Sequence, residues 1–136
     1  MRRILEQEPD LLSKEELAEI LAPTRLYHDV VKDIKATGIK PKASSHITGG
    51  GLPENLERLF GEGIGASLTV PKWDNPIAQK VLAFADEVDR YHTLNMGFGW
   101  ASIVSPEEAE LILSAGPGGQ IIGTITSEEG VKINEA

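Results

Sequence analysis

The chain has 136 residues, of which 40% are hydrophobic and 25% charged, which is the size and composition of one globular domain that can bury a core. Its formal net charge of −8 argues against nucleic acid or an anionic membrane as a partner, and its lack of cysteine excludes disulfides and thiolate metal sites. No apolar run approaches the roughly 20 residues of a membrane span and no signal peptide is recognisable, so we expect a cytoplasmic protein.

The beginning of the chain is predicted to contain two helices. Residues 1–22 form a charged segment in which Ser13 opens a capping-box pattern, and Pro23 ends the helix that follows. Thr24 is a candidate cap for the second helix, which Gly38 ends as a C′ glycine. The second helix is predicted from an apolar stripe at helical spacing, formed by Tyr27, Val30, Val31 and Ile34.

A run of three glycines, Gly49–Gly51, lies between a predicted strand and a predicted helix. The strand covers residues 39–48 with an interruption at Pro41, and Pro53 is expected to open the helix at its first position. Glycine loses the most backbone freedom on folding, so such a run is retained where φ is positive or where a ligand approaches the backbone. Strand, glycine loop and helix N-terminus together present free N–H groups to an anion, usually phosphate. A tight turn without a ligand explains the run equally well, and the run matches neither common nucleotide-binding glycine motif.

Two side chains, one beside this loop and one before the second helix, are candidates for ligand contacts. His46 suits a hydrogen bond to a ligand or to the loop backbone, although a lone histidine is more often structural. It has no partner at metal-ligand spacing, so we predict no metal site. Arg25 precedes the second helix and suits either an anion contact or a solvated pairing with Glu19 or Asp29.

The second half of the chain is predicted to alternate strands and helices loosely, in a broad α/β class. Trp73 is interpreted as a packing anchor rather than a base-stacking residue, and the acidic cluster at residues 86–89 as a charged helix end rather than a magnesium site. The predicted elements are a strand over residues 64–70, a helix capped by Asn75 with Pro76 at N1, a strand over residues 93–104 that contains Gly97 and Gly99, a helix from Ser105, a turn over residues 116–119, and strands over residues 120–127 and 131–133.

Four segments of the chain resemble motifs of one known family. The glycine loop, His46-Ile47-Thr48-Gly49-Gly50-Gly51-Leu52-Pro53-Glu54-Asn55 followed by Arg58, resembles the HxTGGGLxEN motif of aminoimidazole ribonucleotide synthetase, also called phosphoribosylformylglycinamidine cyclo-ligase. Three more matches occur in the family's order: Pro23–Tyr27 resembles PTRIY, Trp73 with Pro76 resembles WxxP, and Thr93–Gly99 resembles TFNMGxG. Together the four segments span about residues 23–100.

The resemblance implies a fold and an activity. The family closes the imidazole ring of formylglycinamidine ribonucleotide in purine biosynthesis, giving aminoimidazole ribonucleotide, ADP and phosphate. This chain resembles only the family's second domain, an α/β (α+β) unit of three α/β/α layers with a mixed sheet, partly like the ferredoxin fold. Residues 1–22 would be an interdomain helical segment and residues 23–136 the C-terminal substrate-binding domain.

The rest of the family's machinery is implied to lie in its N-terminal domain, which this chain does not resemble. ATP and Mg²⁺ would be bound mainly there, with no cofactor intrinsic to this chain, and the full-length protein would be a homodimer. We therefore expect the ribonucleotide substrate and that N-terminal domain as partners, and we expect the chain to be inactive alone.

The resemblance also implies a set of site residues. Thr48 and the glycines Gly49, Gly50 and Gly51 would lie at the phosphate end of the substrate, with His46 and Asn55 lining or bracing the cleft. Asn95, Gly97 and Gly99 would complete a wall, and Arg25, Arg58 and His92 are candidate phosphate contacts. His92 and Leu94 depart from the arginine and phenylalanine usual in the family, which would make this part of the site weaker or more dependent on pH. No side chain is identified as a catalytic acid or base.

Two other interpretations remain open. The chain can belong to another synthetase of the same superfamily, although the glycine loop disfavours this, or it can be a non-catalytic phosphate-binding or interaction module. The ligase domain and the non-catalytic module separate on whether the glycine loop binds phosphate at all, whereas competition between substrates would distinguish another synthetase.

Overall fold

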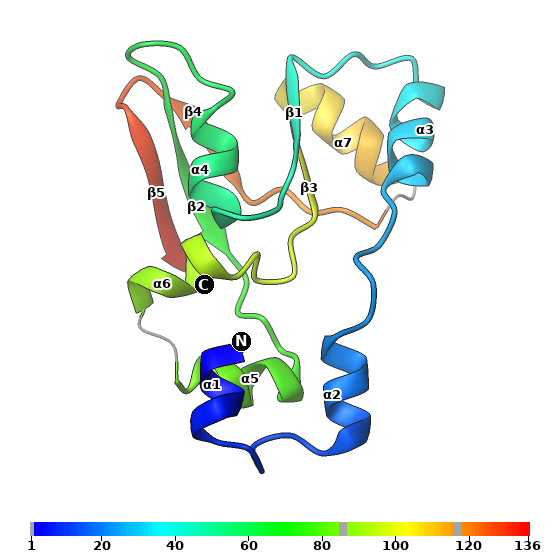
Figure 1. The fold of residues 1–136 in the computed structure, drawn as a ribbon. Coiled ribbons are helices and arrows are strands. Elements are labelled where there is room, and N and C mark those ends of the chain that lie inside the picture. Colours follow the sequence, from blue (N-terminus) through cyan, green and yellow to red (C-terminus); the bar gives the residue numbers. More distant parts are fainter. Residues whose placement is uncertain (1, 85–86, 116–117) are drawn as a thin grey trace.

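The computed structural model describes residues 2–84, 87–115 and 118–136, and it confirms the predicted α+β class. Figure 1 shows the course of the chain. The helices are α1 (Arg2–Gln7), α2 (Lys14–Ile20), α3 (His28–Ala36), α4 (Gly51–Glu57), α5 (Pro76–Leu82), α6 (Glu87–Thr93) and α7 (Pro106–Ser114). The strands are β1 (Ala43–His46), β2 (Gly65–Val70), β3 (Trp100–Ile103), β4 (Gly123–Thr126) and β5 (Gly130–Glu135).

The five described strands form two separate sheets. A mixed sheet has the order β4-β2-β5, in which β2 pairs antiparallel with β4 and parallel with β5. A second sheet consists of β1 and β3, which pair antiparallel from Ala43 opposite Ile103 to His46 opposite Trp100. The predicted mixed sheet is therefore present, and the antiparallel pair β1-β3 forms a separate sheet.

The hydrophobic core lies between α4 and the mixed sheet. Leu52 and Leu56 of α4 pack in one cluster with Leu68 and Val70 of β2 and with Ile47, which precedes the glycine loop. All five side chains are buried. The glycine loop is thus held at the margin of the best-packed part of the molecule, because residues on both sides of it belong to the core.

Several helix boundaries follow from local sequence signals, as predicted. Ser13 and Ser105 each form a full capping box, in which the serine hydroxyl accepts from the third helical N–H and a glutamate accepts from the serine N–H. Asn75 caps α5 with Pro76 at its first position, and Gly38 follows α3 with φ of 79°. These signals act within four residues, so tertiary context does not override them.

Three local predictions are wrong. Thr24 does not cap α3. The N-cap of α3 is Tyr27, whose side chain makes no capping hydrogen bond. The strand predicted over residues 39–48 contains only Ala43–His46. Helix α4 begins at Gly51, so Pro53 is its third residue rather than its first, which is tolerated because N–H groups in the first turn have no helical acceptor.

The strand predicted over residues 93–104 is also much shorter than expected. Helix α6 extends to Thr93, and β3 begins only at Trp100. Between them Met96 and Gly97 take positive φ values of 50° and 83°, which end any extended run. The acidic cluster predicted at residues 86–89 and part of the turn at 116–119 lie outside the residues whose side chains the structure describes.

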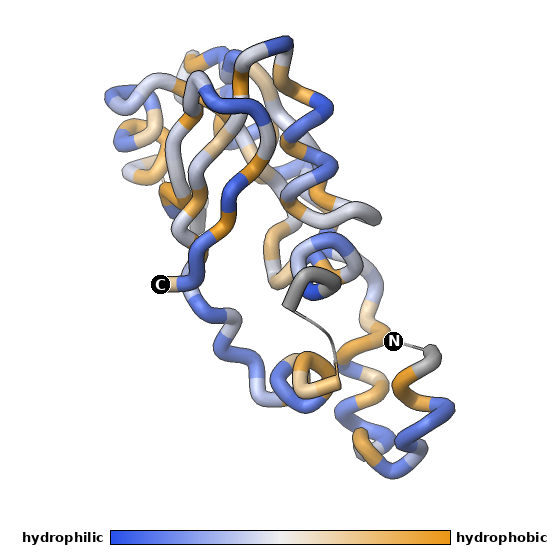
Figure 2. Tube along the Cα trace, turned by 90° about the vertical axis from the view of Figure 1, so that its left-hand side faces the viewer, coloured by the Kyte–Doolittle hydropathy of each residue, from blue (hydrophilic) through white to orange (hydrophobic). Residues whose placement is uncertain are grey.

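Helices α1, α2 and α5 gather at one end of the molecule, away from the mixed sheet (Figures 1 and 2). There Ala78, Val81 and Leu82 of α5 are buried, and the Lys80 ammonium pairs with the Glu16 carboxylate of α2 at 2.6 Å. Within the described ranges, no helix combines the length and apolar character that crossing a membrane requires.

The Glu16–Lys80 pair predicts a pH dependence for the docking of α2. The hydrogen bond from Lys80, followed by that from the Ser13 backbone, holds the pKa of Glu16 below its usual value. A carboxyl whose pKa is lowered by folding contributes stability above its ordinary pKa and loses that contribution as pH falls through the lowered value. We expect amide exchange in α2 to accelerate below about pH 4 relative to α4, and Glu16→Gln to remove this difference. Equal acceleration in native and variant chains would contradict the prediction.

Candidate functional site

The glycine loop connects β1 to α4, and packing explains two of its three glycines. Gly50 and Gly51 have φ values of 89° and 56°, which favour glycine. A Cβ atom on Gly51 would overlap the backbone carbonyl of Tyr91, and one on Gly50 would overlap the Glu54 side chain. Gly49 differs, because its φ is not in the left-handed region and no atom lies within 4 Å of the place where its Cβ would be. Gly49 is also exposed, so nothing in the fold itself demands glycine there.

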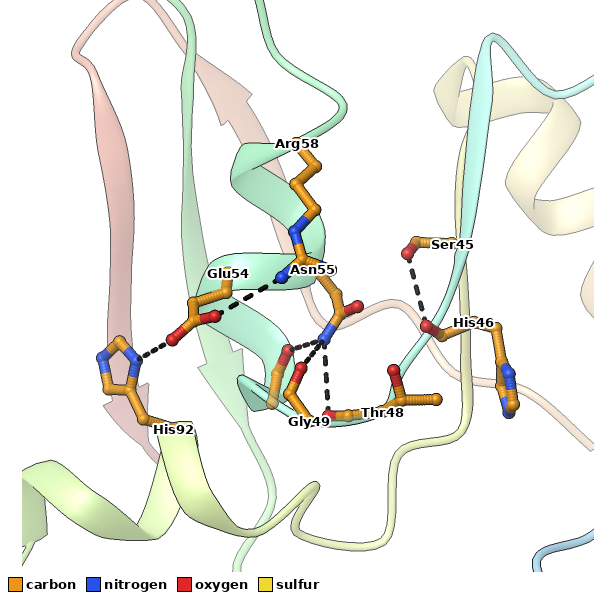
Figure 3. Close-up of polar contacts among 9 residues, drawn as sticks. Ser45, His46, Thr48, Gly49, Glu54, Asn55, Arg58 and His92 are labelled. Carbon is orange, nitrogen blue, oxygen red and sulfur yellow. Dashed lines mark hydrogen bonds and ion pairs between the residues drawn. The ribbon is translucent and has the colours of Figure 1, made fainter.

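The buried side chain of Asn55 braces this loop from the core side. Its amide nitrogen donates to three carbonyl oxygens of the loop, at 2.8 Å to Gly51, 3.1 Å to Gly49 and 3.4 Å to Thr48 (Figure 3). The residue is only 3% exposed, so these bonds are shielded from water. Asn55 therefore fixes the loop conformation from inside the fold, and the outer surface of Thr48 and Gly49 is left exposed.

On one side of the loop, Glu54 brings together two of the candidate phosphate contacts. Its carboxylate lies 3.5 Å from Arg58 Nη2 and 3.7 Å from His92 Nδ1, the latter an ion pair when the imidazole is protonated (Figure 3). All three side chains are about half exposed or more. Sequence reasoning missed the role of Glu54, although its spacing of four residues from Arg58 is the signal for a helical ion pair.

On the other side of the loop, His46 packs with an aromatic residue. Its ring lies away from Glu54 (Figure 3) and 5.6 Å from the ring of Tyr27, centroid to centroid. The guanidinium carbon of Arg25 lies 5.7 Å from the same Tyr27 ring, in cation–π range. Arg25 thus stacks on Tyr27, and the expected pairing with Glu19 or Asp29 is not among the described ion pairs. The prediction treated Tyr27 only as part of an apolar stripe, but it links Arg25 to His46.

The segment Asn95–Gly99 packs against two other motif segments. Gly99 is buried, and a Cβ there would overlap the ring and hydroxyl of Tyr27. A Cβ on Gly97 would lie 3.0 Å from Trp73 Nε1, so the predicted packing role of Trp73 is explained by its contact with this turn. Asn95 is half-buried and its carbonyl accepts from the Phe98 N–H at 2.9 Å. Residues that are distant in sequence, from all four motif segments, therefore meet around β1 and the glycine loop.

The potential metal ligands among the described residues are scattered. These residues contain no group of three or more histidine, aspartate or glutamate side chains placed to hold a metal ion. The acidic side chain at the glycine loop, Glu54, is engaged by Arg58 and His92. These donors do not fit a resident magnesium ion, so no chemical step is assigned to one in this chain.

Comparison with known proteins agrees with the four motifs. A family model described as "AIR synthase related protein, C-terminal domain" matches residues 1–134. The phosphoribosylformylglycinamidine cyclo-ligase of Lachnospira eligens is 35% identical over 132 residues, covering 91% of this chain and 39% of that protein. Proteins of the same name from Exiguobacterium sibiricum and Synechococcus sp. (strain CC9902) are 39% and 42% identical over 121 and 97 residues, covering 84% and 69% of this chain.

The fold and the loop define an α+β domain with a braced glycine-rich connection between a strand and a helix. The chain belongs to the AIR synthase related C-terminal domain family. It spans 39%, 35% and 28% of the lengths of the three relatives named above.

Replacing Asn55 by aspartate should destabilise the loop. The change keeps the shape but removes the amide donor and faces a carboxylate toward three carbonyl oxygens, so we expect a loss of about 2–3 kcal/mol in the free energy of unfolding. Asn134→Asp, at an exposed position in β5, is the matched control and should change stability by less than about 0.5 kcal/mol. Urea unfolding of both variants measures the difference, and equal effects would show that the brace is unimportant.

Gly99→Ala should be destabilising through Tyr27. The added methyl group overlaps the tyrosine ring, and overpacking of this kind costs about 1–3 kcal/mol. Because the clash is with one side chain, Tyr27→Ala combined with Gly99→Ala should cost clearly less than the sum of the single changes. Gly61→Ala, where no atom lies within 4 Å, serves as the control. Additive costs in thermal or urea unfolding would contradict this interpretation.

Proposed function

We propose that this chain is the C-terminal, substrate-binding part of an ATP-dependent cyclo-ligase of purine biosynthesis. In this proposal the outer surface of Thr48–Gly51 receives the phosphate end of formylglycinamidine ribonucleotide. The protein named for this reaction in Lachnospira eligens is similar over nearly all of the present chain, which supports the assignment. ATP and Mg²⁺ would be held by the remaining part of the enzyme, which we expect to act as a cytoplasmic homodimer.

Gly49 is the observation that carries the proposal. The fold requires Gly50 and Gly51 through their φ values and close contacts, but it places no such demand on Gly49. An exposed glycine without a conformational reason is consistent with a ligand that approaches the backbone. Asn55 holds the Gly49 carbonyl in place, so the loop would be preorganised before the substrate arrives.

Cationic side chains lie on both sides of the loop, and a phosphate would have to compete with the Glu54 carboxylate for two of them, Arg58 and His92. The chain as a whole carries −8, so a phosphate must be bound by local cations and backbone dipoles. Arg58 and His92 lie on one side of the loop and His46 on the other, with Arg25 beyond Tyr27. This distribution supports binding of a phosphate end and a polar substrate body on neighbouring surfaces. Ring closure would then depend on holding the substrate in a reactive conformation, which is where positioning contributes most.

A single added methyl group tests the proposal. In Gly49→Ala the new Cβ meets no protein atom, so stability should stay within about 0.5 kcal/mol of the native chain. The methyl group would obstruct a phosphate on the loop, so affinity for formylglycinamidine ribonucleotide should fall about tenfold or more in isothermal titration calorimetry, equivalent to about 1.4 kcal/mol. Gly61→Ala, also in open space but outside the loop, should bind like the native chain.

The titration is repeated with a cyclo-ligase N-terminal domain added. Binding that appears only with this domain, and that Gly49→Ala weakens, would support a site shared between the two domains. Equal binding by the native chain and Gly49→Ala would show that the phosphate of the substrate does not bind at this loop. Absence of binding under both conditions would refute the proposal and favour a non-catalytic interaction module.

A further inference from the structure

Two strand edges without partners border the same groove. Among the described residues, β3 pairs only with β1, and β4 pairs only with β2, so each has one unpaired edge. Residues of both strands line one groove of about 1340 Å³. This volume exceeds the roughly 300–1,000 Å³ typical of small-molecule pockets, which makes a chain segment a better occupant than a metabolite.

The hydrogen bonds show which peptide groups are directed away from the existing partners. Ile47 N–H donates to the Gly99 carbonyl at 2.9 Å, so in β3 the alternate residues Trp100 and Ser102 direct their backbone groups toward the other edge. Thr69 N–H donates to the Ile122 carbonyl at 2.7 Å, so Gly123 and Ile125 do the same in β4. Each edge therefore offers a short ladder of donors and acceptors.

The lining of the groove is mostly apolar and incompletely covered. Ile121 and Ile125 line it with exposed fractions of 53% and 45%. Helix α7 contributes Ile112 and Leu113, yet none of its residues is fully buried. Large apolar side chains beside unpaired strand edges are a liability in a soluble domain, which proteins usually remove by covering the edge.

We propose that the groove receives an extended apolar strand from the part of the enzyme outside residues 1–136, which pairs with β3 on one side and β4 on the other. The sheet order would become β1-β3-strand-β4-β2-β5, a single sheet in place of two. Addition of a strand uses main-chain hydrogen bonds for affinity and side-chain pockets for specificity. A strand inserted between two edges can form main-chain hydrogen bonds on both of its sides, whereas a strand added to a single edge forms them on one side. One inserted strand therefore covers both edges.

The lengths of the relatives favour this occupant over a second copy of the chain. The chain spans 39% of the Lachnospira eligens protein, so most of such an enzyme lies outside the matched region. The matched family is a C-terminal domain, which puts the remainder on the N-terminal side. Helix α1 begins at its end nearer the sheets (Figure 1), so a preceding segment would leave the helix on that side. This inference depends on family membership and not on phosphate binding at Thr48–Gly51, none of which lines the groove, although the candidate site residues Arg25, Gly97 and Gly99 do line it.

Hydrogen exchange on the chain of residues 1–136 tests the inference. The probes are overlapping synthetic peptides of about 12 residues, about twice the length of a typical strand, which tile the part of the Lachnospira eligens protein outside the matched region. We expect one stretch of that protein to bind and to slow exchange at Trp100, Ser102, Gly123 and Ile125 by about tenfold or more. Slower exchange at both edges is required, because binding at a single edge or elsewhere would not join the sheets.

Two lysine variants separate the groove from the rest of the sheet. Ile125→Lys puts a charge on the groove-lining edge strand and should abolish peptide binding and protection. Thr69→Lys makes the same charge change at an exposed position of β2 that does not line the groove, and should bind like the native chain. Circular dichroism shows whether each variant is folded. If Ile125→Lys unfolds, the protection pattern in the native chain decides instead.

Three results would overturn the inference. One is the failure of every peptide to protect both edges. Another is unchanged binding by folded Ile125→Lys. The third is concentration-dependent protection of β3 and β4 without peptide, which would show that a second copy fills the groove. None of these results bears on Gly49→Ala binding, so the two proposals can fail separately.

Discussion

The close approach of the glycine loop to the C-terminal half of α6 is the constraint on which the site depends. Gly51 lies against the Tyr91 carbonyl with no space for a side chain. The Glu54 side chain occupies the place where a Cβ atom on Gly50 would be. This contact determines where α4 begins and brings His92 to the loop. The buried Asn55 amide then hydrogen-bonds the three loop carbonyls from the core side. Backbone crowding and one buried amide thus hold the loop, and its outer face is left free for a ligand.

Features that depend on a few neighbouring residues were predictable. The capping boxes at Ser13 and Ser105 and the Asn75 cap form as expected, because donor and acceptor lie within four residues. Strand β2 was predicted almost to the residue, since it is a short apolar run between turns and is the central strand of the mixed sheet. The glycine loop was located correctly for the same reason, as a local cluster of residues that no regular element tolerates.

Features decided by tertiary contacts were not predictable. The segment after Thr93 has the apolar and aromatic residues of a strand, yet Met96 and Gly97 turn it so that Gly97 meets Trp73 and Gly99 meets Tyr27. Both contacts join residues more than twenty positions apart, which a periodicity argument does not sample. The pairing of Glu54 with His92 was missed for the same reason, because the two residues are distant in sequence. The stacking of Arg25 on Tyr27 is a local contact and was missed because Tyr27 was assigned to an apolar stripe.

The groove and the glycine loop are mechanically connected through β3. Gly99, which leads into β3, accepts a hydrogen bond from Ile47 just before the loop and packs under Tyr27, which contacts His46. The outer edge of the same strand lines the groove. A strand bound there would restrain β3 and, through Gly99, both Ile47 and Tyr27. In such an enzyme, docking of the preceding segment would therefore order the glycine loop as well as complete the sheet, because β3 is shared by both.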